Sequence, residues 1–212
     1  MLVLGLDTSS PAVTAVLVEV GAAGCTLVRE RVVVDGRRHG ELLAVGVREV
    51  LQGGRPGAVA VGTGPGPFTG LRVGLVTAAA LADAFGVPAY GVCSLDAIGK
   101  GDRVVVGDAR RREVYWACYA GGVRVEGPAV EAPAALAGRL GPGTPVVGAG
   151  AALHAAAFAG CAVGAVLHPD GLALVRLAAD RVLAGAPSEP LTPLYLRRPD
   201  AVEPGAVKRV TA

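Results

Sequence analysis

The residues best placed to do chemistry lie in a glycine-rich loop, Gly62-Thr63-Gly64-Pro65-Gly66-Pro67-Phe68-Thr69-Gly70-Leu71-Arg72. An apolar run enters this loop and a nearly uncharged segment leaves it, as expected between a strand and a helix. Backbone N–H groups at such a helix start can hold a phosphate. However, no lysine follows the last glycine as GxxxxGK[ST] requires, and the glycine spacing does not fit GxGxxG. We therefore expect a tight structural corner with Thr69 capping the helix, and Gly64 and Gly66 are secondary candidates for nucleotide contact.

Two aspartates, Asp7 and Asp108, each end an apolar, strand-like run beside small polar or basic residues. In a duplicated fold, an aspartate at this position can hold a metal–nucleotide complex, so Asp7 is a further nucleotide candidate. The alternative is that the side chain starts a hairpin turn through hydrogen bonds to its own backbone. For Asp108, which is followed by Arg110, Arg111 and Arg112, an ion pair is the favoured role.

Other catalytic chemistry finds no support in the sequence. The three histidines, His39, His154 and His168, are far apart, and neither HxxxH nor HExxH occurs, which argues against a zinc peptidase. The serine-hydrolase pattern GxSxG is also absent. The four cysteines form no CxxC pair, which is typical of reduced thiols in a cytosolic protein. We predict no catalytic residue, no metal site and no cofactor for the isolated chain.

The composition indicates a cytoplasmic α/β protein that does not span a membrane. Of the 212 residues, 52% are hydrophobic, 4% are aromatic, and the net charge is +2. A field this weak argues against tight nucleic-acid binding by the chain alone, and RNA contact through the arginine clusters is the minority alternative. The chain start lacks the basic region of a signal peptide. The uncharged stretch 146–167 is long enough to span a bilayer, but its glycines favour a strand, turn, helix and second strand.

The elements that must position these residues occur twice along the chain. Each half contains an apolar strand ending in Asp, two antiparallel strands, a helix, and a strand followed by a Gly-x-Gly loop and a helix-like segment. The expected strands are 2–6, 13–20, 26–34, 58–61, 89–93, 103–108, 113–119, 123–130 and 145–147. A duplicated unit with mixed sheets is the simplest account, divided into subdomains 1–98 and 99–212. The second subdomain ends in a Pro-rich stretch, 190–196, and a tail that we expect to be mobile beyond Asp200.

Three longer helices are expected, at 41–51, 70–85 and 172–184. The first has an inner stripe of Leu43, Val47, Val50 and Leu51, and the last has Leu174, Leu177, Ala178 and Val182 at helical spacing. The middle helix carries charge only at Arg72 and Asp83, so we expect it to be covered on both sides. Its small residues Gly70, Gly74, Ala78 and Ala82 recur every four positions, a smooth row that would let another helix approach closely.

Several runs, taken together and in this order, resemble the TsaB (YeaZ) family. They are Leu4-Gly5-Leu6-Asp7-Thr8-Ser9, then Gly64-Pro65-Gly66-Pro67-Phe68-Thr69-Gly70-Leu71-Arg72-Val73-Gly74, then Asp108-Ala109-Arg110 with Glu113-Val114-Tyr115, and Pro193-Leu194-Tyr195-Leu196-Arg197. The resemblance covers most of the chain. Members of this family usually have Ser at the position of Pro67, so a hydroxyl does no chemistry there in this chain.

The resemblance implies the duplicated α/β fold shared by actin, sugar kinases and heat-shock chaperone ATPases, which is the ASKHA or ribonuclease H-like class. It also implies a role in making threonylcarbamoyladenosine beside the anticodon of tRNAs. In that system TsaD, a metal-bearing paralogue with an HxxxH motif, transfers the threonylcarbamoyl group. TsaB is its non-catalytic partner and TsaE is an ATPase that joins them, so ATP and Mg would bind only in the assembled complex.

The same resemblance implies that helices of the first subdomain bind TsaD or, in its absence, a second copy of the chain, while tRNA is met indirectly through the complex. The expected interface residues are Leu42, Val45, Gly70, Val73, Gly74, Thr77, Ala78 and Leu81. The substitution Ala78→Glu is then expected to abolish partner binding and leave the monomer folded. The alternative function is a free-standing ATPase or kinase of the same fold, using Asp7 and the glycine loop.

Overall fold

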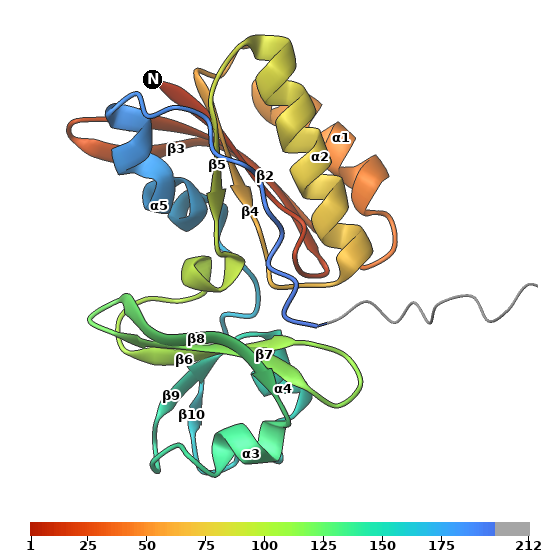
Figure 1. The fold of residues 1–212 in the computed structure, drawn as a ribbon, viewed down its shortest axis with the longest axis vertical. Coiled ribbons are helices and arrows are strands. Elements are labelled where there is room, and N and C mark those ends of the chain that lie inside the picture. Colours follow the sequence, from red (N-terminus) through yellow and green to blue (C-terminus); the bar gives the residue numbers. More distant parts are fainter. Residues whose placement is uncertain (198–212) are drawn as a thin grey trace, which may run out of the picture.

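The computed structural model describes residues 1–197, in which ten strands form two five-stranded sheets, one above the other in Figure 1. The first sheet has the order β3-β2-β1-β4-β5. In it, β1 is antiparallel to β2 and parallel to β4. Its strands are β1 (Leu2–Asp7), β2 (Ala12–Gly21), β3 (Gly24–Val34), β4 (Ala58–Gly62) and β5 (Ala89–Val92). Both β1 and β4 are apolar runs with almost every residue buried, as expected for strands covered on both faces.

The second sheet repeats this arrangement, with the order β10-β9-β6-β7-β8. Its central strand β6 is antiparallel to β7 and parallel to β9, as β1 is to β2 and β4. The strands are β6 (Arg103–Asp108), β7 (Val114–Ala120), β8 (Val123–Glu131), β9 (Pro145–Val147) and β10 (Ala162–Val163). The same strand order in both sheets confirms the predicted duplication.

The helices of the first half pack as their apolar stripes predict. Helices α1 (His39–Leu51) and α2 (Phe68–Phe85) cover one face of the first sheet (Figure 1). Leu43, Val47, Val50 and Leu51 are buried beneath α1 with residues of β1, β2 and β4, which confirms the predicted inner stripe. The end of α2 is a left-handed Gly86, with φ of 65°.

The opposite face of the first sheet is covered by α5 (Gly171–Leu183), which comes from the second half of the chain (Figure 1). Asp170 caps this helix by accepting a hydrogen bond from the Ala173 N–H. Val175 is buried in its inner stripe, whereas Leu177 is 46% exposed, so its predicted core role is wrong. The division near residue 99 therefore separates the two sheets, but the predicted unit 99–212 is wrong because α5 belongs to the first domain.

The second domain has shorter helices than the first. They are α3 (Pro133–Ala137) and α4 (Ala149–Leu153), each five residues long. The stretch 146–167 contains the end of β9, then α4 and β10, which confirms the prediction of strand, turn, helix and strand over a membrane span. A 3-10 helix, η1 (Ser94–Ala97), begins the connection between the domains.

The buried side chain of Arg103 fixes this connection. Its guanidinium donates hydrogen bonds to the carbonyl oxygens of Ile98 at 2.6 Å, Gly101 at 2.8 Å and Asp96 at 3.2 Å. Three acceptors compensate for burying a charged group, which would otherwise be costly. The connection is thus held by the first residue of β6.

Residues 184–197, here called the C-terminal segment, run past both domains. Leu191 packs against the core beneath α1 and α2, whereas Leu194 and Leu196 pack against the core of the second sheet. The Leu194 N–H also donates to the carbonyl of Thr63 in the glycine loop. The predicted mobile tail beyond Asp200 lies outside the described residues.

Candidate functional site

The glycine-rich loop packs tightly against the end of β1. A Cβ atom on Gly62 would collide with the Asp7 carboxylate, and one on Gly66 would collide with the backbone of Ser9. The Gly64 N–H donates to Ser94 Oγ at 3.1 Å, and Gly64 has φ of 92°. The space beside these glycines is therefore filled by the chain itself. The loop is a structural corner, as predicted, although the N-cap is Pro67 and the expected Thr69 cap is wrong.

The Asp7 carboxylate is buried, and both of its oxygens accept hydrogen bonds from neighbours. One oxygen accepts hydrogen bonds from the backbone N–H and the hydroxyl of Ser9, at 2.9 and 2.8 Å. The other oxygen accepts from the Ser94 hydroxyl at 2.6 Å. Burial raises the pKa of Asp7 above its ordinary value, and the hydrogen bonds from Ser94 and Ser9 oppose this shift only in part. Of the two roles that the sequence allows, this geometry is that of a turn-forming aspartate.

Asp108 makes the expected ion pair. Its carboxylate accepts a hydrogen bond from the Arg110 N–H at 2.8 Å and lies 3.2 Å from the Arg110 guanidinium. Next to it, a cavity of about 200 Å³ lies where the two domains meet, lined by prolines and aliphatic residues together with Ser9, Ser10, Tyr115 and Arg110. Pockets for small molecules usually have about 300–1,000 Å³. The cavity is thus small for a nucleotide.

No group of three or more His, Cys, Asp or Glu side chains lies together within residues 1–197. His39 uses its Nε2 atom in a contact of 3.0 Å with the carbonyl oxygen of Ser10. Burial raises the pKa of Cys93 to about 11, so this thiol stays protonated at neutral pH. Cys93 is therefore not an activated nucleophile.

The small-residue row of α2 faces its own domain. Ala78 is fully buried in the core, and a Cβ on Gly74 would collide with the hydroxyl of Thr8, which donates to the Gly70 carbonyl at 2.7 Å. Small residues here let the helix approach β1 and the turn after it. Gly70, Gly74 and Ala78 are therefore core positions, and the prediction that they face a partner is wrong. Ala78→Glu would change the stability of the monomer as well as any partner binding.

The other expected interface residues lie nearer the surface. Val73, Thr77 and Leu81 of α2 are half-buried, as are Leu42 and Val45 of α1. Their role as partner contacts stays a prediction. Leu42, Val73 and Leu81 also pack against the core beneath the two helices.

The outward face of α2 lies opposite the small-residue row, and sequence reasoning missed it. Val76 is 67% exposed and Phe68 is 41% exposed, and Ala79, Ala80 and Ala84 are also exposed. Because Val76 is two residues from both Gly74 and Ala78, a helical wheel could have separated the two faces. The outward face, defined by Arg72, Val76, Ala79, Ala80 and Asp83, is an apolar surface with one charge toward each end.

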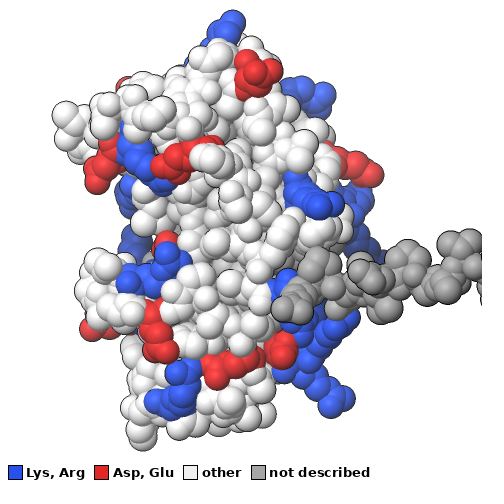
Figure 2. Space-filling view, in the orientation of Figure 1, with Lys and Arg blue, Asp and Glu red and all other residues white. Residues whose placement is uncertain are grey.

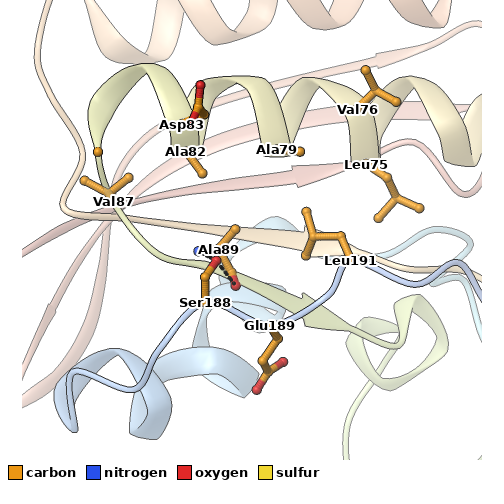
Figure 3. Close-up of a pocket in the computed structure, with 11 residues that line it drawn as sticks. Leu75, Val76, Ala79, Ala82, Asp83, Val87, Ala89, Ser188, Glu189 and Leu191 are labelled. Carbon is orange, nitrogen blue, oxygen red and sulfur yellow. Dashed lines mark hydrogen bonds between the residues drawn. The ribbon is translucent and has the colours of Figure 1, made fainter.

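A groove of about 630 Å³ runs beside the outward face (Figure 3). Its walls are Leu75, Val76, Ala79 and Asp83 of α2, and Ser188, Glu189 and Leu191 of the C-terminal segment. Ser188 accepts a hydrogen bond from the Ala89 N–H at 3.0 Å, so the C-terminal segment covers the edge strand β5. The groove is mainly apolar, and the carboxylate of Glu189, which lines it, is paired with Arg181 at 2.7 Å.

Among the described helices, α2 alone is long and apolar enough to cross a membrane by length and composition. One such helix is weak evidence, because core helices of water-soluble domains pass the same test. Its inner face packs on the first sheet through Leu71, Leu75 and Ala78. Its outward face, where Val76 is 67% exposed, is not covered by the described chain.

The fold and the filled glycine loop define the class of protein. Two mixed sheets of identical strand order, each with its helices, constitute the ASKHA or ribonuclease H-like fold. The chain is similar to the solved structure of YeaZ from Pseudomonas aeruginosa, with a TM-score of 0.73 and 25% identity, over 92% of this chain and all of that one. The family model described as tRNA N6-adenosine threonylcarbamoyltransferase, TsaD, matches residues 35–174.

Three sequence relatives complete the comparison. An uncharacterised protein of Mycobacterium tuberculosis is 49% identical over 94% of this chain and 93% of its own length. The tRNA threonylcarbamoyladenosine biosynthesis protein TsaB of Escherichia coli is 43% identical over 70 residues, which are 29% of this chain and 30% of that protein. The chain spans 56% of the length of a further relative, from Mycobacterium leprae. It belongs to the TsaB (YeaZ) family.

Proposed function

We propose that this chain is a cytoplasmic, non-catalytic scaffold subunit that binds and activates TsaD. TsaD would then transfer the threonylcarbamoyl group to the adenosine beside the anticodon of tRNAs. TsaE joins the assembled complex, and any ATP and Mg are bound there and not by the isolated chain. Family membership supports the pathway, and the two faces of α2 support the scaffold role.

The observation that carries this proposal is the outward face of α2. Val76 is 67% exposed on a helix whose charged residues are Arg72 and Asp83, and it is continuous with the apolar groove of Figure 3. Contiguous apolar surface of this kind marks protein-binding sites. A scaffold needs such a surface, whereas a kinase or ATPase needs an open phosphate site.

A single charge on the outward face tests the proposal. Val76→Glu should abolish co-purification with TsaD and the TsaD-dependent modification of tRNA, because the new carboxylate would be buried without a partner in the interface. Val123→Glu is the matched control, because Val123 is 68% exposed on β8 of the second domain. Capture of TsaD by the Val76→Glu protein at the wild-type level would contradict the proposal.

Without TsaD, we propose that a second copy of the chain covers the same face. Arg72, Val76, Ala79 and Asp83 have spacings of four, three and four residues, which read the same in both directions. In an antiparallel pair of α2 helices related by a two-fold axis, Arg72 of each copy lies opposite Asp83 of the other, and Val76 opposite Ala79. Asp83 has no ion-pair partner within residues 1–197, so a partner's arginine would satisfy it.

Exchange of the two charges tests this pairing. Arg72→Asp and Asp83→Arg should each weaken the dimer about threefold or more, because like charges would then face each other. The double variant should recover dimerisation, as measured by sedimentation equilibrium. A double variant that dimerises no better than the single variants would exclude this register.

The alternative function, a free-standing ATPase or kinase, requires a nucleotide at Asp7 and the glycine loop. Calorimetry with Mg-ATP on the isolated chain decides between them. Binding in the micromolar range corresponds to a binding free energy of about −8 kcal/mol. The scaffold proposal predicts no such binding of Mg-ATP, because the carboxylate of Asp7 already accepts hydrogen bonds from Ser9 and Ser94. Micromolar binding with turnover would favour the enzyme.

A further inference from the structure

We propose that this chain has an RNA contact surface of its own, at the start of α2. The surface consists of a basic cavity, an exposed aromatic stack and the arginine turn between β6 and β7. The inference rests on the proposed function and deepens it, because it assigns part of the tRNA contact to the scaffold subunit.

The basic cavity has a volume of about 380 Å³ and lies between the starts of α1 and α2 and the arginine turn. Arg37, His39 and Arg110 line it, together with Ser10 and Thr69. Within residues 1–197 the Arg37 side chain has no ion-pair partner, and the Arg110 side chain is 65% exposed although it meets Asp108. The cavity therefore presents positive charge to solvent.

The aromatic stack lies where the C-terminal segment passes the first turn of α2. Phe68 and Tyr195 are stacked, with ring centroids 4.9 Å apart and planes at 28°, and they are 41% and 39% exposed. The guanidinium carbon of Arg72 lies 3.9 Å from the centroid of the Phe68 ring. Every other aromatic side chain is buried or half-buried in the described residues, so this pair is an exception to the way the chain uses aromatic residues.

The arginine turn connects the cavity to the stack. Arg110, Arg111 and Arg112 all have positive φ, of 62°, 51° and 62°. Glycine, Asn and Asp adopt this conformation at less cost, so three arginines in succession indicate that charge is needed there. Arg197, two residues after Tyr195, donates to the Ala109 carbonyl at 2.9 Å and pairs with Glu113. Arg110 lines the cavity, so the three parts form one continuous surface.

Charge is concentrated on this surface. Within residues 1–197, seven arginines and three carboxylates lie on it, although the whole chain has a net charge of only +2. The arginines are Arg37, Arg38, Arg72, Arg110, Arg111, Arg112 and Arg197, and the carboxylates are Asp35, Asp108 and Glu113. Figure 2 shows basic side chains gathered beside and below the place where the described chain ends.

The combination of arginines with an exposed aromatic stack is better suited to binding RNA than to binding an acidic protein. An acidic protein surface needs only the positive charges, whereas a parallel pair of exposed rings with an arginine beside it offers a platform for an unstacked base. The arginines along the cavity and the turn can follow the phosphates on either side of that base. We therefore assign a single-stranded stretch of the tRNA substrate to this surface.

The test is the affinity of the wild-type TsaD complex and its variants for fluorescently labelled tRNA, measured by anisotropy between about 50 and 200 mM salt. Arg37→Gln combined with Arg112→Gln should weaken binding and lower the slope of log affinity against log salt by about 1 to 2. Tyr195→Ala should weaken binding about fivefold or more and remove a photochemical crosslink between the RNA and the C-terminal segment. Arg55→Gln is the matched control, because Arg55 stacks on Phe85 at the opposite end of α2 and its loss should change neither quantity.

Three results would overturn the inference. The first is an unchanged affinity, slope and crosslink in both variants. The second is loss of TsaD capture in the variants, which would make the surface a protein interface. The third is complete displacement of the RNA by millimolar AMP, which would make it a mononucleotide site. Failure of the wild-type chain to capture TsaD would instead refute the proposed function, and the same titrations on the full chain alone at low salt would still decide the RNA contact.

Discussion

At the scale of single residues, Asp7 is a candidate for nucleotide contact in the sequence and a turn-forming residue in the structure. Its two oxygens accept three hydrogen bonds from Ser9 and Ser94, and the neighbouring Gly62 leaves no room for a ligand. The carboxylate joins the turn after β1 to η1 at the start of the connection between the domains. Such a buried carboxylate, hydrogen-bonded through both oxygens, stabilises a corner of the chain.

The raised pKa of Asp7 gives a prediction for its isosteric variant. The folded protein binds a proton at Asp7 more tightly than the unfolded chain, so the contribution of this group falls as the pH rises from its ordinary value, 3.8, through its raised value. Asp7→Asn lacks this titration. The free energy of unfolding of Asp7→Asn, relative to wild type, should therefore increase from pH 4 to neutral pH in urea titrations.

A constant difference between the two proteins over this pH range would show that the Asp7 carboxylate titrates normally. Asp7→Glu, which keeps the charge, is the control and should retain a pH dependence. Because Asp7 has no assigned role in binding, neither variant should lose capture of TsaD while it remains folded.

At the scale of elements, α2 has two apolar faces with different consequences for stability. Ala78 is fully buried against the sheet, whereas Ala80, two residues later, is exposed. Ala78→Glu should therefore destabilise the monomer by about 3 kcal/mol or more, because it buries an unpaired charge. Ala80→Glu should change the free energy of unfolding by about 0.5 kcal/mol or less.

Urea unfolding of the two variants measures this difference directly. Equal midpoints for Ala78→Glu and Ala80→Glu would mean that the small-residue row is solvent-accessible after all. The same pair is informative in TsaD capture, because the exposed Ala80→Glu protein is folded and carries its charge on the outward face.

At the scale of the whole molecule, the C-terminal segment joins the two domains. Leu191 packs into the first core and Leu194 into the second, and the Tyr90 hydroxyl donates to the Ala186 carbonyl at 2.6 Å. A chain that ends at Gly185 should lose about 3 kcal/mol or more of stability, because it loses these side chains and exposes the edge of β5. A chain that ends at Arg197 retains every contact described for the segment, and its thermal midpoint should stay close to that of the full chain.

Differential scanning calorimetry separates two outcomes of the shorter truncation. A single transition at lower temperature is expected if the two domains still unfold together, and two transitions if the segment alone couples them. Equal midpoints for the chains that end at Gly185 and at Arg197 would show that residues 186–197 contribute nothing to stability.

The sequence predicts much of this fold because apolar runs and turn residues report on local structure. The inner stripe of α1 and the strand and helix on either side of the glycine loop follow from such patterns. The direction of the row Gly70, Gly74, Ala78 does not, because small residues at four-residue spacing suit a neighbouring strand as well as a neighbouring helix. The domain to which α5 belongs cannot be predicted from the sequence either. Leu174 and Val182 show that the helix has an apolar stripe, but they do not show which sheet the stripe covers.

The return of α5 to the first sheet has a consequence for how the protein is made. Domains usually fold in the order in which they leave the ribosome. Here Leu174 and Val175 complete the core around Val3 and Val16, so the domain that is synthesised first is the last to be finished. Until residues 171–183 have emerged, one face of its sheet stays open, and helices α1 and α2 rest on an incomplete support. Assembly with TsaD should therefore follow translation of this chain and not accompany it.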